Sequence, residues 1–201
     1  YGTNEELYLY HKLFRLVLGT NNLDHKTYLD TPGLPIDHYD FLNVETANLI
    51  LLIGSDPAEE LPILDLRIKK AVTRKGVKLA ILNDQKTALD RFADLSLTYD
   101  VGADEEAFAA LANGLAGELG LPIVDGGASG KLTTGVGIEQ MKSMVEMVRT
   151  GMKVCVIYNP ASLTGKSIHM LKYLLTVISK IPTIECGAIP AAPFTNALGA
   201  M

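Results

Sequence analysis

Short apolar runs alternate with longer stretches of helical periodicity along most of this chain. Short segments predict strands at residues 49–53, 77–82, 95–99, 121–124, 154–158 and 183–188, and the continuous apolar run 49–53 is typical of a strand buried on both faces. Apolar residues that recur every three to four positions predict helices within residues 7–17, 61–76, 108–119, 138–148 and 168–178. Strands that alternate with helices predict an α/β fold, in which a doubly wound, mostly parallel sheet carries helices on both faces.

A glycine-rich stretch at residues 126–137 suggests a division of the chain into two lobes. The first predicted lobe is 1–125, an α/β unit that begins with a helix. The second is 126–201, an α/β unit truncated at its C-terminus. The chain opens on Tyr1 and ends at Met201, and we interpret both ends as cuts inside a longer polypeptide.

Two strand-to-helix loops share one pattern. The sequence Asx-Pro-Ala follows the apolar run 49–53 at residues 56–58, and it follows the run 154–158 at residues 159–161. The repeat suggests two related lobes, although Asx-Pro is also an ordinary turn signal. Because ligands of parallel sheets bind at the carboxyl ends of the strands, function is expected in these loops.

The charge balance argues against a nucleic-acid partner. The chain has 201 residues and a formal net charge of −5, whereas binding to phosphates calls for a clustered basic surface. The basic residues that do cluster are interpreted as one helix end and its flank: Arg67, Lys69, Lys70, Arg74, Lys75 and Lys78. No apolar run is long enough to span a bilayer, so no direct membrane insertion is expected.

The two cysteines, Cys155 and Cys186, are predicted to be buried free thiols. They lie in separate predicted strands and lack Cys-x-x-Cys spacing, although a bridge or a metal pair stays an alternative. They cannot hold an iron–sulfur cluster by themselves.

The segment from Pro160 to Ser167 partly matches a phosphate-binding loop. Such a loop needs Gly-x-x-x-x-Gly-Lys-Ser/Thr, and Gly165, Lys166 and Ser167 fit its end. Pro160 stands at the first glycine position, and proline has no amide to offer a phosphate. The pattern favours a helix start with a solvated lysine, while nucleotide binding stays an alternative.

No other motif gives a catalytic set or a metal site. Asp56, Glu59 and Glu60 bring three carboxylates to one turn, where they could do acid–base work or hold a cation, but they also suit the positive end of a helix dipole. The four histidines share no ligand spacing: His11, His25, His38 and His169.

Several motifs carry a family resemblance. The loop Gly54-Ser55-Asp56-Pro57-Ala58, then Pro62, then Arg74, Lys75, Gly76 and Lys78, and later Arg91, Ala93 and Asp94, resemble the molybdopterin oxidoreductase superfamily. The closing stretch 195–200 resembles the start of that family's Asn-x-x-Gly-Ala turn. The opening stretches 3–15 and 19–25 resemble more closely the large iron–sulfur subunit of bacterial NADH–quinone oxidoreductase, or respiratory complex I.

The departures from the superfamily concern its cofactor loops. Catalytic members carry Asn at the position of Asp56 and Asp-Pro-Arg at residues 83–85, where this chain has Asn83-Asp84-Gln85. The resemblance therefore implies vestigial loops that hold no cofactor, at positions Ser55, Asp56, Pro57, Asn83, Asp84, Asn159 and Pro160. It implies no metal in this fragment, and iron–sulfur clusters in an upstream part of the parent subunit.

The resemblance implies a non-catalytic structural and docking domain in a proton-pumping NADH:quinone oxidoreductase. The expected partners are other subunits of the peripheral arm, and the expected location is the cytoplasmic side of the inner membrane. One alternative is a fragment of a catalytic, formate dehydrogenase-like molybdopterin oxidoreductase. Another is a small nucleotide-binding domain that uses Gly165-Lys166-Ser167.

Overall fold

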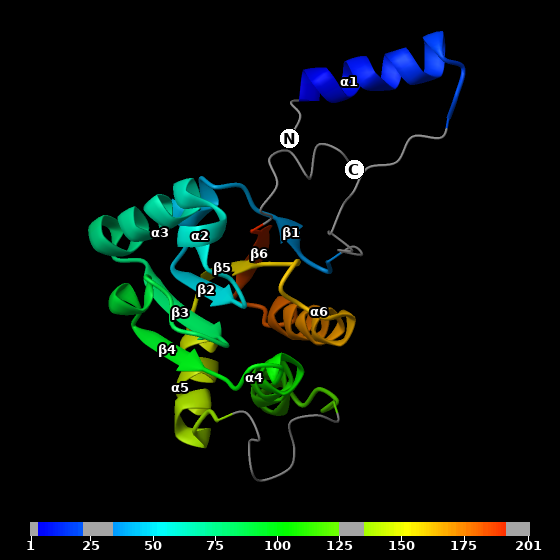
Figure 1. Cartoon of the computed structure of the whole chain (residues 1–201). Helices are drawn as coiled ribbons and strands as arrows, with labels where there is room; N and C mark the ends of the chain where they lie inside the picture. Colours follow the sequence, from blue (N-terminus) through cyan, green and yellow to red (C-terminus); the bar gives the residue numbers. More distant parts are fainter. Residues whose placement is uncertain (1–3, 22–33, 125–134, 192–201) are drawn as a thin grey trace.

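Parallel strands form one sheet in the computed structural model, which describes residues 4–21, 34–124 and 135–191 (Figure 1). Its strands are β1 (Asp37–His38), β2 (Leu49–Ile53), β3 (Lys78–Asn83), β4 (Leu95–Thr98), β5 (Lys153–Tyr158) and β6 (Glu185–Pro190). Among the described residues the six-stranded sheet has the order β1-β6-β5-β2-β3-β4, and every neighbouring pair is parallel. The predicted fold class is confirmed.

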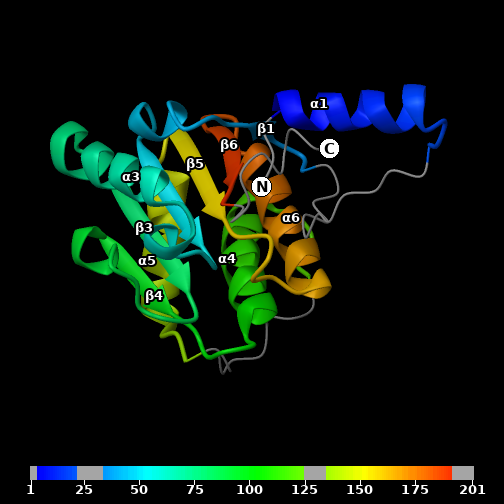
Figure 2. The same ribbon diagram turned by 45° about the horizontal axis from the view of Figure 1, so that its top comes forward.

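Helices cover both faces of this sheet (Figure 2). They are α2 (Pro57–Glu60), α3 (Pro62–Lys75), α4 (Asp104–Leu119), α5 (Ile138–Arg149) and α6 (Gly165–Ser179). The first helix, α1 (Asn4–Lys12), lies apart from the sheet in Figure 1. α3 packs on one face, and α4, α5 and α6 pack on the other. Within β2, Ile50 and Leu52 join the core on the α3 side, whereas Leu51 and Ile53 join the core on the opposite side. This strand is apolar throughout because both of its faces are buried.

The helix predicted within residues 61–76 begins at a proline and ends at a glycine. Pro62 opens α3, where its missing amide costs no intrahelical hydrogen bond. Gly76 ends the helix in the left-handed conformation, with φ +70°.

The strand predicted at residues 121–124 is wrong. Among the described residues the segment joins no sheet, and the side chain of Asn113 pairs with the backbone of its last residue, Val124. The Asn113 amide donates to the carbonyl of Val124 at 2.9 Å, and its oxygen accepts from the Val124 amide at 3.0 Å. These hydrogen bonds hold the segment against α4 in place of a neighbouring strand.

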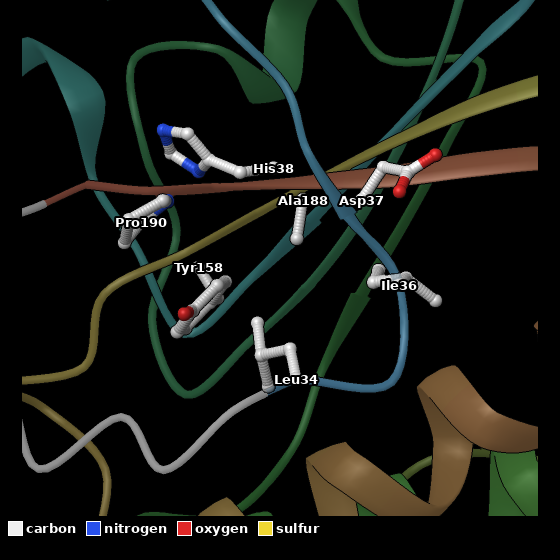
Figure 3. A pocket seen from close by; sticks show the side chains of 7 residues that line it. All are labelled: Leu34, Ile36, Asp37, His38, Tyr158, Ala188 and Pro190. Atoms are coloured by element: carbon white, nitrogen blue, oxygen red, sulfur yellow. The ribbon is translucent and has the colours of Figure 1, made fainter.

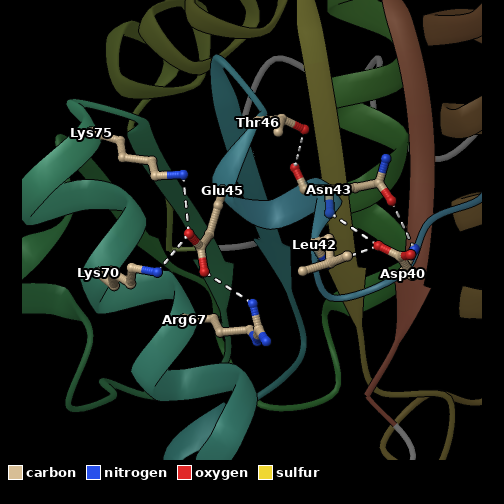
Figure 4. A network of polar contacts seen from close by, with 8 residues as sticks. All are labelled: Asp40, Leu42, Asn43, Glu45, Thr46, Arg67, Lys70 and Lys75. Carbon is tan, nitrogen blue, oxygen red and sulfur yellow. Dashed lines mark hydrogen bonds and ion pairs between the residues drawn. The ribbon is translucent and has the colours of Figure 1, made fainter.

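Three cations of the basic cluster, all on α3, surround the carboxylate of Glu45 (Figure 4). Arg67 Nη1 lies 2.9 Å from Glu45 Oε1, and the Nζ atoms of Lys70 and Lys75 lie 2.8 and 3.0 Å from Oε2. Hydrogen bonds from Lys70 and Lys75 lower the pKa of Glu45 to about 2. The cluster thus joins α3 to the turn at Asn43–Glu45 that precedes β2.

Both cysteines are free, as predicted, but only Cys155 is buried, whereas Cys186 is half-buried. Cys155 is buried on the α3 side of the sheet, and Cys186 packs against the core on the opposite side. Burial is the main cause that raises the pKa of each thiol to about 12. Among the described residues, no helix has both the length and the apolar character needed to cross a bilayer.

Strands from both predicted lobes share the sheet. β2, from the first predicted lobe, pairs with β5, from the second, in the register Ile53 to Tyr158. The predicted boundary at residue 125 lies outside the described residues, so the division into lobes stays a prediction. After β2 the chain moves toward β3 on one side, whereas after β5 it moves toward β6 on the other. The carboxyl ends of β2 and β5 therefore form the topological switch point of the sheet.

Candidate functional site

Two loops meet at the switch point, one after β2 and one after β5. Ser162, in the second loop, donates its hydroxyl to the carbonyl of Gly54 in the first at 2.6 Å. Gly54 adopts φ +53°, and a Cβ there would lie 3.2 Å from Leu163 and 3.7 Å from the hydroxyl of Tyr99. The close approach of the two loops therefore depends on a glycine with a positive φ.

The two Asx-Pro-Ala sequences adopt the same turn. Asp56 Oδ1 accepts from the amide of Ala58 at 3.1 Å, and Asn159 Oδ1 accepts from the amide of Ala161 at 2.8 Å. In both loops the oxygen of the Asx side chain caps the turn that follows the strand. At Asp56 this oxygen serves the start of α2.

Glu60 links the two loops through its carboxylate. Oε2 accepts from the hydroxyl of Ser55 at 2.6 Å, while Oε1 accepts from the side-chain amide of Asn159 at 2.6 Å and from the backbone amide of Asp56 at 3.2 Å. Ser55 and Asn159 are 2% and 7% exposed, so these hydrogen bonds are largely sheltered from water. The sequence marked Glu60 only as one of three carboxylates in a turn, because its partner Asn159 lies 99 residues away.

Asn83 and Asp84 lie beside the same loops, at the end of β3. The side-chain amide of Asn83 donates to the carbonyl of Ser55 at 3.3 Å, and its oxygen accepts from the amide of Asp84 at 3.1 Å. Burial raises the pKa of the nearby Tyr99, and the charges of Asp84 and Asp104 raise it further. The carboxylates of Asp84 and Asp104 therefore lie near enough to Tyr99 to disfavour its ionisation.

The Gly165-Lys166-Ser167 sequence begins α6, as the sequence predicts. Thr164 caps the helix, and its Oγ1 accepts from the amide of Ser167 at 3.3 Å. The hydroxyl of Ser167 donates to the carboxylate of Asp104 at the start of α4. Ser167 is 1% exposed, so its hydroxyl is already engaged inside the protein. This arrangement counts against a nucleotide site built on these residues.

The structure brings the predicted loop positions together at one edge of the sheet. Hydrogen bonds connect Ser55, Asp56 and Asn159 through Glu60, and Asn83 joins them through Ser55. Pro57 and Pro160 are buried at the starts of the two turns. Whether these positions are vestigial cofactor contacts stays a prediction.

The histidines are not gathered into a site. His11 lies on α1, His38 on β1 and His169 on α6, while His25 lies outside the described residues. Within residues 4–21, 34–124 and 135–191, no group of three or more His, Cys, Asp or Glu side chains is placed to hold a metal ion.

A separate cavity of about 220 Å³ lies near the edge strand β1 (Figure 3). It is lined by Leu34, Ile36, Asp37, His38, Tyr158, Ala188 and Pro190. Burial raises the pKa of Tyr158 to about 12, so its hydroxyl stays protonated at neutral pH. The lining is mostly apolar, and it does not include the Glu60 network.

A family model described as molybdopterin oxidoreductase matches residues 1–199. Over 112 residues the chain is 35% identical to a Bacillus subtilis protein named as a probable oxidoreductase, YjgC, an alignment that covers 51% of this chain and 11% of the relative. It is 32% identical over 113 residues to a second protein of that organism, YrhE, named as a formate dehydrogenase, with 51% and 12% coverage. The matched stretch thus spans only about a tenth of these curated relatives.

Solved structures share the fold at low sequence identity. Acetylene hydratase from Pelobacter acetylenicus gives a TM-score of 0.57 at 17% identity, covering 78% of this chain and 24% of that chain. The formyltransferase/hydrolase complex from Methylorubrum extorquens gives a TM-score of 0.55 at 13% identity, covering 81% and 41%. These likenesses concern the fold alone.

Proposed function

Since the chain belongs to the molybdopterin oxidoreductase family, we propose that it is a structural α/β domain of a larger, formate dehydrogenase-like oxidoreductase. The observation that carries this proposal is the 32–33% identity, over half of the chain, to relatives named as formate dehydrogenases from Bacillus subtilis and Staphylococcus haemolyticus. The names of these relatives support a formate dehydrogenase-like protein more than a complex I subunit.

The proposed role is structural because the described residues offer no reactive group suited to redox chemistry. Burial raises the pKa values of the two thiols, of which Cys155 is buried and Cys186 half-buried. The polar side chains of the switch point hydrogen-bond to one another. The aligned stretch is about a tenth of each relative, so the redox centre would belong to other parts of the larger protein.

The switch point does not fit the phosphates of a pterin dinucleotide, the cofactor that the family resemblance implies. A bound phosphate needs free donors, and Ser55 and Asn159 already donate to Glu60. Ser167 likewise donates to Asp104. A phosphate at this position would replace hydrogen bonds that are already made and would meet two carboxylates of its own sign.

That lack of fit favours a second candidate function. A fold that keeps the loops of a cofactor domain but fills them with its own carboxylates suits a docking domain without a cofactor. Such a domain would serve in the large iron–sulfur subunit of a proton-pumping NADH:quinone oxidoreductase. Its partners would be other subunits of the peripheral arm, on the cytoplasmic side of the inner membrane.

One purification distinguishes the two candidates. The natural polypeptide that carries this chain would be isolated with its partners, and its molybdenum or tungsten content, formate:dye reduction and NADH:quinone reduction would be measured. Stoichiometric metal with formate oxidation supports the formate dehydrogenase-like protein. Absence of both metals, together with co-purifying NADH:quinone reductase activity, would overturn it in favour of the complex I protein.

A further inference from the structure

The loop donors at the switch point converge on one internal carboxylate. Doubly wound sheets bind anionic ligands in this crevice, because loop amides and hydroxyls at the carboxyl ends of the strands point into it. Here Ser55 Oγ, Asn159 Nδ2 and the backbone amide of Asp56 all point at Glu60, at 2.6, 2.6 and 3.2 Å. Glu60 therefore receives the hydrogen bonds that a bound anion would receive.

A second carboxylate lies at the start of α6. Asp104 accepts from the hydroxyl of Ser167, which also contacts the capping side chain Thr164 at 2.8 Å. α6 has 15 residues, so its N-terminus carries the positive end of a helix dipole. Asp104 comes from α4, an element separate in sequence, and thus places a negative charge of the protein itself beside this helix end.

We infer that Glu60 and Asp104 act as internal anions that close the switch-point crevice to phosphate-bearing ligands. Each carboxylate contacts donors on a loop or helix distant in sequence, by 99 residues for Glu60 with Asn159 and 63 for Asp104 with Ser167. Glu60 therefore also connects the loop after β2 to the loop after β5. Asp104 connects α4 to α6. We call these two contacts the carboxylate clasp.

The clasp makes the crevice selective by charge. A phosphate that entered would leave the two carboxylates without their donors, and an unpaired carboxylate in a sheltered site is costly. Glu60→Gln keeps one acceptor oxygen, which can still serve Asn159 and the Asp56 amide at the Oε1 position. It should instead leave the hydroxyl of Ser55 without its carboxylate acceptor and remove the charge that repels another anion.

The test uses the 201-residue chain and inorganic pyrophosphate as the probe, titrated by calorimetry at low ionic strength. The variants are Glu60→Gln and the double variant Glu60→Gln/Asp104→Asn. The matched control is Glu59→Gln, which removes the same charge from the adjacent exposed residue of α2. The wild type and the control should show no saturable binding. Glu60→Gln should bind pyrophosphate saturably, and the double variant should bind it more tightly still.

Thermal melts give a second measurement, which remains informative if the variants are less stable than the wild type. Both clasp variants should melt below the wild type, and saturating pyrophosphate should raise their midpoints but not that of Glu59→Gln. The inference is overturned if the wild type binds pyrophosphate saturably, or if the clasp variants stay folded at the titration temperature and gain no saturable binding. The result does not depend on the proposed function, because it concerns the isolated chain and neither metal content nor redox activity.

Discussion

The ring of Tyr39 lies directly against the backbone of Gly187. A Cβ built on Gly187 would lie 2.2 Å from Tyr39 Cδ1 and 2.3 Å from Cε1, distances that real atoms do not adopt. The amide of Tyr39 donates to the carbonyl of Ala188 at 2.9 Å, and its hydroxyl donates to Glu185 Oε1 at 2.7 Å. The side chain of Tyr39 thus extends along β6, from its backbone contact at Ala188 to its hydroxyl contact at Glu185. The ring fits there because Gly187 has no side chain.

Replacing Gly187 with alanine should destabilise the protein. The new methyl group would force the ring away from β6 and weaken its hydrogen bond to Glu185, a cost of about 1–3 kcal/mol in the free energy of unfolding. Chemical denaturation of Gly187→Ala would measure it. The matched control is Gly117→Ala, at an exposed position of α4 with open space around the added Cβ, which should stabilise by about 0.5–1 kcal/mol. Equal effects of the two substitutions would contradict the packing of Tyr39 on Gly187.

Glu45 should make stability depend on pH in the acid range. Because its pKa is lowered to about 2 in the folded protein, its charge stabilises the fold above the pKa of an unfolded glutamate. This contribution is lost as the pH falls from about 5 through about 2. The denaturation midpoint of the wild type should exceed that of Glu45→Gln at pH 7, and the difference should shrink toward pH 2.

A glutamate in an exposed ion pair provides the control for this pH dependence. Glu139, whose side chain is 86% exposed, contacts only Lys142 at 2.9 Å in the ion pairs of the described residues. Glu139→Gln should give a small difference from the wild type with little dependence on pH, since exposed pairs contribute little. A constant difference between the wild type and Glu45→Gln from pH 7 to pH 2 would show that the three cations do not act through the Glu45 charge.

The sheet could be predicted from the sequence, but the contacts that close its crevice could not. The run from Leu49 to Ile53 is apolar at every position, which only a strand covered on both faces requires. The partners of Glu60 depend on the placement of β5 beside β2, which local periodicity does not encode. At residues 121–124 the pattern of a strand was present, yet the side chain of Asn113 took over the backbone hydrogen bonds. The order of the strands and the hydrogen bonds of single polar side chains therefore could not be predicted from the hydrophobic pattern.

The two thiols should react slowly in the native state. At pH 8 an ordinary cysteine is roughly a quarter ionised, whereas a pKa of about 12 leaves about one thiolate in ten thousand. Reaction of Cys155 and Cys186 with a disulfide reagent should therefore be about a thousandfold slower than that of glutathione. In concentrated guanidinium both thiols should react fully and at ordinary rates. Rapid native labelling of either cysteine would contradict the raised pKa of its thiol.

The two Asx turns should respond unequally to exchange between Asp and Asn. Asp56 uses only its Oδ1 oxygen, as acceptor for Ala58, and asparagine keeps that acceptor. Asp56→Asn should therefore leave the free energy of unfolding nearly unchanged, while Asp56→Ala should cost about 0.5–2 kcal/mol. Urea denaturation of the two variants measures this difference. A large loss of stability in Asp56→Asn would show that the charge of Asp56, and not only its acceptor oxygen, stabilises the turn.

Asn159 makes the same turn but also donates to Glu60 at 2.6 Å, and aspartate cannot donate when ionised. Asn159→Asp would place two carboxylates against each other in a sheltered site, and it should cost about 1–3 kcal/mol at pH 7. The double variant Asn159→Asp/Glu60→Gln should recover part of this loss, because the glutamine amide can donate to the new carboxylate. Urea denaturation of the single and double variants measures the coupling between the two positions. Additive effects would show that Glu60 and Asn159 do not interact, and the clasp would then lack its central contact.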